Sequence, residues 1–142
     1  WLPTLPEQYT IYHYANYEAT RLEILGKRYG DTENPWLKHF QTRLVDLKEG
    51  AREYAVYPLY FYSLKNICKF LGFSWTSEVQ SGRASITAYE SWLSSQDHAI
   101  LDDIIRYNRD DVRATAHLLH WLNTYAREEG VYSRPYPWQA SS

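Results

Sequence analysis

The sequence predicts an α/β fold in which helices far outnumber strands. Two short runs, residues 9–13 and 43–47, are rich in the β-branched, aliphatic and aromatic residues that strands favour. Much of the remaining chain carries apolar side chains at helical spacing. A sheet of one or two strands would be poorly covered on one side, and the chain has no methionine and begins Trp1-Leu2-Pro3. We therefore expect an incomplete fold whose leading strands lie upstream.

Between the two predicted strands, the sequence contains signals for the start and end of two helices. A helix is expected over residues 16–29, because Asn16 is suited to cap its start and Gly30 to end it. A shorter helix is expected over residues 35–42, because proline at position 35 is favoured in the first turn of a helix. The first half of the chain is thus predicted to run strand, helix, helix, strand.

The second half of the chain is predicted to be mostly helical. Residues 49–62 are ambiguous, since their Tyr/Val alternation is compatible with a strand while a glycine and a proline favour an extended loop. Ser63 is suited to cap a helix that extends to residue 71, where a glycine follows. A short helix over residues 85–92 and a long one over residues 97–129 complete the predicted elements.

Length, charge and cysteine content limit the possible functions. At 142 residues the chain can bury a core, and we expect one domain over residues 1–132 followed by a Pro-rich, loosely held tail over residues 133–142. The formal net charge of −2 gives no general attraction for nucleic acid, so such contact would be local or metal-mediated. The single Cys68 is expected to be a buried thiol, which agrees with a cytoplasmic location. No membrane-spanning run or signal peptide is visible, and no membrane partner is expected.

A carboxylate falls on the apolar face of the long predicted helix. The residues that share this face at helical spacing are Ile100, Ile104, Tyr107, Asp111, Leu118 and Leu122. Asp110 is expected to be rotated away from it, beside Arg106 and Arg113. An acid on an apolar face is unfavourable without a partner. The partner of Asp111 is either a hydrogen-bond donor from a neighbouring loop or a metal ion.

A second carboxylate shows the same pattern near the first predicted strand. On the helix over residues 16–29, Glu18 is in phase with Leu22, Leu25 and Tyr29. Two inward-facing acids from distant parts of one chain suggest that both meet at a cation. The hypothesis requires that both side chains point into the protein.

The motifs around these acids resemble those of a known family. Tyr107-Asn108-Arg109-Asp110-Asp111 is similar to the third, Tyr-x-x-x-Asp, motif of the ribonuclease H-like DEDD exonucleases, and the segment from His13 to Glu18 resembles their second motif. Tyr89-Glu90-Ser91-Trp92 adds a resemblance to the exonuclease-like domain of predicted RecB-type nucleases. The resemblance covers residues 9–123 and implies a ribonuclease H-like α/β fold.

This resemblance implies a metal-dependent 3′–5′ exonuclease. In the family, four carboxylates hold two divalent ions, Mg²⁺ or Mn²⁺, which activate a water and stabilise the leaving oxygen. By motif match, Glu18 and Asp111 would be metal ligands and Tyr107 would orient the water. The family's leading Asp-x-Glu motif is absent, because the only such triplet, Asp31-Thr32-Glu33, is expected to form a turn. We expect the missing acids in an upstream segment of the same polypeptide, and little activity from this chain alone.

The sequence evidence for residues that contact nucleic acid is weaker than the evidence for metal ligands. Lys65 follows an extended segment at a helix start and could reach a phosphate, and Arg109 belongs to a basic stripe with Arg106 and Arg113. The competing interpretation is that these are solvated side chains, with Arg106 paired to Asp102 on the same helix. DNA is favoured over RNA as the partner. A non-catalytic nucleic-acid-binding or protein-interaction module, or a helical scaffold, remains the alternative to an enzyme.

Overall fold

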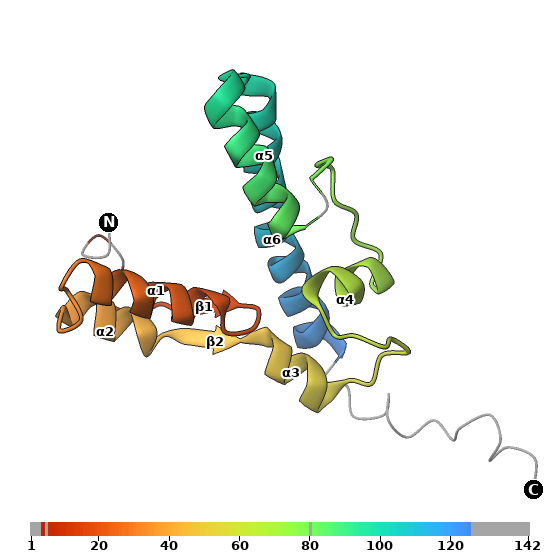
Figure 1. The fold of residues 1–142 in the computed structure, drawn as a ribbon. Helices are drawn as coiled ribbons and strands as arrows, with labels where there is room; N and C mark the ends of the chain where they lie inside the picture. The colour runs from red at the N-terminus through yellow and green to blue at the C-terminus, as the bar shows by residue number, and fades with distance from the viewer. Residues whose placement is uncertain (1–3, 5, 80, 126–142) are drawn as a thin grey trace, which may run out of the picture. The chain divides into compact units, whose positions relative to one another are not determined.

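The computed structural model describes residues 4, 6–79 and 81–125 (Figure 1). The chain divides into two compact units, one comprising residues 1–58 and 118–142 and the other residues 59–117. The described elements are mostly helices, with a small sheet in the first unit. The predicted helix-rich α/β class is therefore confirmed. The predicted tail over residues 133–142 lies outside the described residues.

The sheet of the first unit contains two parallel strands. β1 (Ile11–His13) pairs with β2 (Leu44–Asp46), with Ile11 opposite Leu44 and His13 opposite Asp46. Parallel neighbours need a long crossover connection, which α1 (Tyr17–Arg28) and α2 (Pro35–Gln41) provide. Both strands end at the same edge of the sheet, so His13 and Asp46 lie side by side there.

A third helix follows β2 directly, in a region where the sequence was ambiguous between a strand and an extended loop. α3 (Leu47–Tyr54) begins at Asp46, whose carboxylate accepts a 2.8 Å hydrogen bond from the Lys48 amide. Leu47 and Ala51, one turn apart, are buried and anchor the helix. Gly50 is tolerated inside it, and Pro58 lies beyond its end. The extended-loop interpretation is therefore wrong for residues 49–54, because a capping Asp and two buried apolar residues outweigh one glycine.

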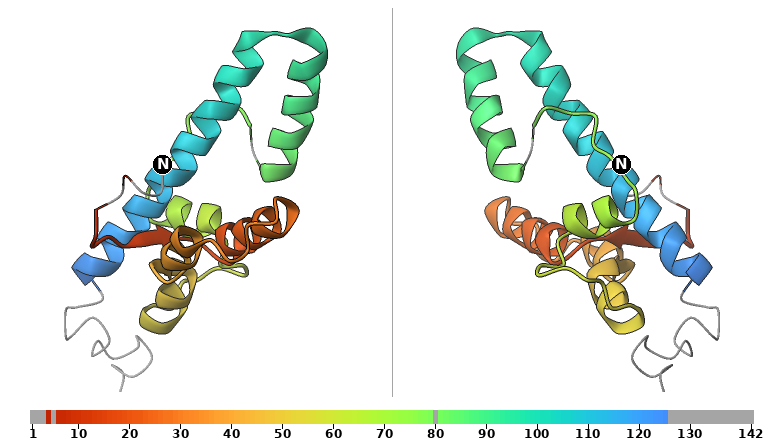
Figure 2. Two further views of the ribbon diagram at one scale, coloured as in Figure 1. Left: turned by 90° about the vertical axis from the view of Figure 1, so that its left-hand side faces the viewer. Right: turned by 90° about the vertical axis from the view of Figure 1, so that its right-hand side faces the viewer.

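The second unit is built from α4 (Leu64–Phe70), α5 (Gly82–Ser95) and α6 (His98–Tyr125), the last of which continues into the first unit. Ser63 caps α4 as predicted, accepting a 3.1 Å bond from the Asn66 amide. α5 starts earlier than predicted because Ser81 caps it in the same way, and it ends at Gln96, which adopts the left-handed conformation. α5 and α6 run in opposite directions from the short turn that joins them (Figure 2).

α4 packs against α6 through small and apolar residues. Ile67, Cys68 and Ala114 are completely buried, and the Cys68 thiol donates a 3.3 Å hydrogen bond to the Ala114 carbonyl. Burial, with a smaller contribution from the Asp111 charge, raises the pKa of Cys68 to about 12. The prediction of a buried thiol is confirmed. No helix in the described part of the chain is long and apolar enough to cross a membrane.

Candidate functional site

Asp111 lies in a half-buried position on α6 and is hydrogen bonded on the side that faces the loop after α4. The indole Nε1 of Trp75 donates a 2.8 Å hydrogen bond to its Oδ1 atom. Tyr107, one turn earlier on the same helix, also makes a side-chain hydrogen bond to Asp111. One of the two partners expected for Asp111, a hydrogen-bond donor from a neighbouring loop, is therefore present. A ligand role for Asp111 stays a prediction.

The environment of Tyr107 keeps its hydroxyl protonated. Burial contributes most, followed by the Asp111 charge and the hydrogen bond between the two side chains, and together they raise the pKa of Tyr107 to about 12. A tyrosine hydroxyl hydrogen bonded to an ionised carboxylate is the donor, because the carboxylate can only accept. Tyr107 therefore acts as a neutral proton donor beside Asp111 throughout the physiological pH range.

Lys65 lies close to these two residues. Its Nζ atom is 5.4 Å from the centre of the Trp75 ring and 5.9 Å from the centre of the Tyr107 ring. Burial lowers the pKa of Lys65, the charge of Lys69 lowers it further, and the charge of Asp111 opposes both effects. The second unit thus brings together three predicted site residues, Lys65, Tyr107 and Asp111.

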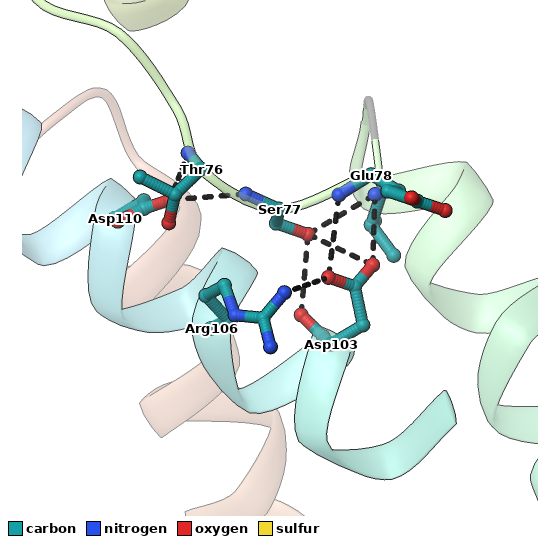
Figure 3. A network of polar contacts seen from close by, with 7 residues as sticks. Thr76, Ser77, Glu78, Asp103, Arg106 and Asp110 are labelled. Carbon is teal, nitrogen blue, oxygen red and sulfur yellow. Dashed lines mark hydrogen bonds and ion pairs between the residues drawn. The ribbon is translucent and has the colours of Figure 1, made fainter. Parts of the chain in front are cut away.

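The acid next to Asp111 occupies a different environment from the one predicted. Asp110 was expected to point away from the core, yet only 1% of its surface is exposed. Its Oδ2 atom accepts hydrogen bonds from the Thr76 amide at 2.6 Å, the Thr76 hydroxyl at 2.9 Å and the Ser77 amide at 3.3 Å. The prediction is wrong because this loop runs along the edge of the apolar face of α6 and covers it (Figure 3).

Hydrogen bonding keeps Asp110 ionised despite its burial. Burial alone would raise the pKa of Asp110, because it disfavours the charged form. The hydrogen bonds from Thr76 and Ser77, together with the charge of Arg113, reverse this effect and hold the pKa below its ordinary value. Asp110 is therefore a buried anion that fixes the loop rather than a surface charge.

Asp103 fixes the next part of the same loop. It lies seven residues before Asp110, on the same edge of α6, and accepts bonds from the Glu78 and Val79 amides at 3.2 and 3.1 Å. The Ser77 hydroxyl lies within hydrogen-bond distance of both the backbone carbonyl and the carboxylate of Asp103 (Figure 3). Arg106 pairs with Asp103 at 3.2 Å, not with Asp102 as the sequence suggested. The loop over residues 76–79 is thus held at two points on α6.

Glu18 does not face a core in the structure. Its side chain is 50% exposed, and Leu25 and Tyr29, which share its predicted face, are exposed as well. The only residue of α1 that is fully buried is Gly26, where an added Cβ atom would lie 3.2 Å from a Leu37 methyl group. The predicted inward orientation of Glu18 is wrong, because the packed face is set by a glycine, which hydrophobic periodicity does not register.

The surroundings of Glu18 are a network of structural contacts at the end of β1. The His13 ring is buried, with its Nδ1 atom 2.7 Å from the Ala15 carbonyl and 3.6 Å from Glu18. Ala15 has a positive φ of 61°, and its amide donates a 2.8 Å bond to Asp46. Asp46 therefore joins the turn after β1 to the cap of α3.

Arg109, the remaining residue predicted to contact nucleic acid, is separate from the group formed by Lys65, Tyr107 and Asp111. Arg109 is exposed on α6, and two helical positions place it about 200° around the axis from Asp111. Trp75, in contrast, is a direct neighbour of Asp111, and no pattern in the sequence indicated this contact. It lies in a loop without periodicity, so only its aromatic character could have suggested a role.

The described residues do not form a metal site by themselves. No group of three or more His, Cys, Asp or Glu side chains among them is arranged to hold an ion. In the second unit Asp111 provides a carboxylate, and one of its oxygens already accepts a bond from Trp75. Mg²⁺ and Mn²⁺ prefer several oxygen ligands, including carboxylates and water. The ligand set that the resemblance implies is therefore not complete in this part of the chain.

Comparison with known proteins gives one match. A family model described as the RNase H superfamily matches residues 4–123, which is most of the chain and includes every predicted site residue. No curated protein and no solved structure showed significant similarity. The match agrees with the parallel strand pair and its helical crossover in the first unit.

Proposed function

The chain belongs to the RNase H superfamily, and on this premise we propose that the protein acts as a nuclease on nucleic acid, DNA in preference to RNA. More specifically, we propose a divalent-metal-dependent 3′–5′ exonuclease similar to the tyrosine-type DEDD enzymes and to the exonuclease-like domain of RecB-type nucleases. A cytoplasmic location is part of the same proposal.

The observation that supports this proposal best is the pair formed by Asp111 and Tyr107. A carboxylate and a hydroxyl whose pKa is raised to about 12 lie next to each other on one helix, with the Lys65 side chain nearby. Such a group combines a metal-binding oxygen, a hydrogen-bond donor and a positive charge, which hydrolysis of a phosphodiester requires. We propose that Asp111 is a carboxylate ligand of Mg²⁺ or Mn²⁺ and that Tyr107 orients the attacking water. The remaining acids are proposed to come from an upstream segment of the same polypeptide.

The test is metal-dependent shortening of a single strand labelled at one end. The polypeptide, including its upstream segment, is incubated with a 5′-labelled oligonucleotide in the presence of Mn²⁺ or of a chelator. We expect a ladder of progressively shorter labelled products with Mn²⁺ and an intact strand with the chelator. Release of a labelled mononucleotide at the earliest time would instead indicate the opposite polarity. An intact strand under all conditions would contradict the nuclease proposal.

Glu18 does not have the inward orientation that the two-acid hypothesis required, so its proposed role as a second ligand rests on the motif match alone and is tested separately. If it binds the ion, Glu18→Gln should lower the rate of cleavage by roughly 100-fold, the scale on which one lost electrostatic contact acts. Its half-exposed side chain predicts a change in the free energy of unfolding within about 0.5 kcal/mol. Glu23→Gln on the same helix is the matched control, because Glu23 is exposed and paired with Lys27. Equal rates for both variants would remove Glu18 from the ligand set.

A non-catalytic nucleic-acid-binding module is the second candidate function. It is favoured by the absence, among the described residues, of three clustered metal-binding side chains. It is also favoured by a cluster of basic and aromatic side chains beside α4. In the oligonucleotide experiment this alternative predicts binding without shortening, even when the upstream segment is present and Mn²⁺ is added.

A further inference from the structure

A pocket of about 340 Å³ opens beside α4 in the second unit. Its wall consists of two lysines of α4 and four residues of the loop that follows: Lys65, Lys69, Gly72, Phe73, Ser74 and Trp75. The pocket therefore combines positive charge on one side with aromatic surface on the other. Arg109 and Glu18 are not part of it.

The two lysines place positive charge on one wall of the pocket. Lys65 and Lys69 are four residues apart on α4, so they lie one turn apart on the same face. Both line the pocket, and partial burial together with the Lys69 charge lowers the pKa of Lys65. Asp111 is the acid that opposes this effect. An anion placed between the two ammonium groups would relieve their repulsion and replace the hydration that burial removes.

The aromatic wall is held in place by several contacts. Phe73 and Trp75 contact each other edge to face, with ring centres 4.9 Å apart. Trp75 is fixed by its bond to Asp111, and the next residue, Thr76, is fixed by its bonds to Asp110. A wall that is already ordered loses little conformational entropy when a ligand binds. Positive charge beside fixed aromatic rings is the combination with which proteins bind single-stranded nucleic acids.

We propose that this pocket binds one phosphate group of a single-stranded nucleic acid between Lys65 and Lys69, with the sugar and base of the same nucleotide against Phe73 and Trp75. This rests on the proposed nuclease function and adds a substrate subsite to it, next to Asp111. A local site of this kind also explains how a chain with a net charge of −2 can hold a polyanion.

The test measures binding without cleavage. Fluorescence anisotropy of a labelled single-stranded oligonucleotide is recorded with the full chain in the presence of a chelator. Simultaneous Lys65→Gln and Lys69→Gln substitution should weaken binding roughly tenfold, the effect of losing a charge-assisted contact. The slope of log affinity against log salt should fall by about 0.7, as expected for one phosphate of a single strand. Lys38→Gln is the matched control, because Lys38 is an exposed lysine of the first unit.

The outcomes separate this subsite from the nuclease proposal. Equal affinity and equal salt dependence of the double variant and the Lys38 control, with both proteins folded by circular dichroism, would overturn the subsite whether or not the strand is cleaved in Mn²⁺. Weakened binding of the double variant, together with an intact strand when the polypeptide that includes its upstream segment is tested in Mn²⁺, would retain the subsite and contradict the nuclease proposal. Inorganic phosphate should compete at least about tenfold less well than the oligonucleotide, because it cannot contact the aromatic wall. Equally good competition would refute the assignment to nucleic acid.

Discussion

Asp111→Asn is expected to lower the rate of strand shortening by at least about 100-fold, the scale on which one lost electrostatic contact to the transition state acts. The substitution keeps the shape of the side chain and an oxygen that can accept the 2.8 Å bond from Trp75. It removes the negative charge that a divalent ion requires. The loss should therefore appear in the catalytic rate while the fold is retained, as measured by end-label assays and circular dichroism.

The same variant provides a structural readout that does not depend on catalysis. The Asp111 charge is one of the causes that raise the pKa of Tyr107 to about 12, and burial is the larger one. Removing the charge should lower the pKa of Tyr107 toward its ordinary value, detectable by ultraviolet titration against the wild type. Asp102→Asn, an exposed acid on the same helix, should leave both the cleavage rate and the titration unchanged. If Asp111→Asn shifts the titration but leaves cleavage intact, Asp111 is structural and not a ligand.

The sequence predicted most elements of the fold because their boundaries carry local signals. Ser63 caps α4 through its side chain, and Asn34 accepts bonds from two amides at the start of α2. Both signals act within one turn, so neighbouring residues suffice to recognise them. α3 was missed because its capping residue, Asp46, was assigned to the second predicted strand and the rest of its support is not local. Its stability comes from the burial of Leu47 and Ala51, which depends on the fold around them.

The acids show where hydrophobic periodicity stops being informative. The apolar face of α6 was identified correctly, since Ile104 and Leu118 are buried. The mistake concerned its edge. Asp110 lies on that edge and is covered by the loop over residues 76–79. The sequence of α6 contains no pattern that predicts along which edge of the helix this loop packs. Glu18 was misplaced for a related reason, because the packed face of α1 contains Gly26, which has no side chain to mark it.

Asp110→Ala is expected to destabilise the second unit by roughly 3 kcal/mol, because three hydrogen bonds to a buried carboxylate would be lost and their donors left without this acceptor. The bonds come from the amide and hydroxyl of Thr76 and the amide of Ser77. Urea denaturation followed by circular dichroism measures the difference. Asp102→Ala on the exposed side of α6 is the control and should change the free energy of unfolding by no more than about 0.5 kcal/mol. A similar small change for Asp110→Ala would show that the loop is held by other contacts.

The pH dependence of this effect follows from the direction of the pKa shift. The pKa of Asp110 is lowered in the folded protein, so the unfolded chain binds this proton first as the pH falls. The stabilisation is therefore complete above the ordinary aspartate pKa of about 4, and it is lost as the pH falls through the folded value. The difference in unfolding free energy between wild type and Asp110→Asn should be constant from about pH 7 to 5 and shrink below about pH 4. A difference that grows in acid would contradict the assignment.

Trp75 directly precedes the loop that Asp110 holds. Loosening this loop by Asp110→Ala should therefore also weaken oligonucleotide binding, which links the buried anion of α6 to the proposed phosphate subsite.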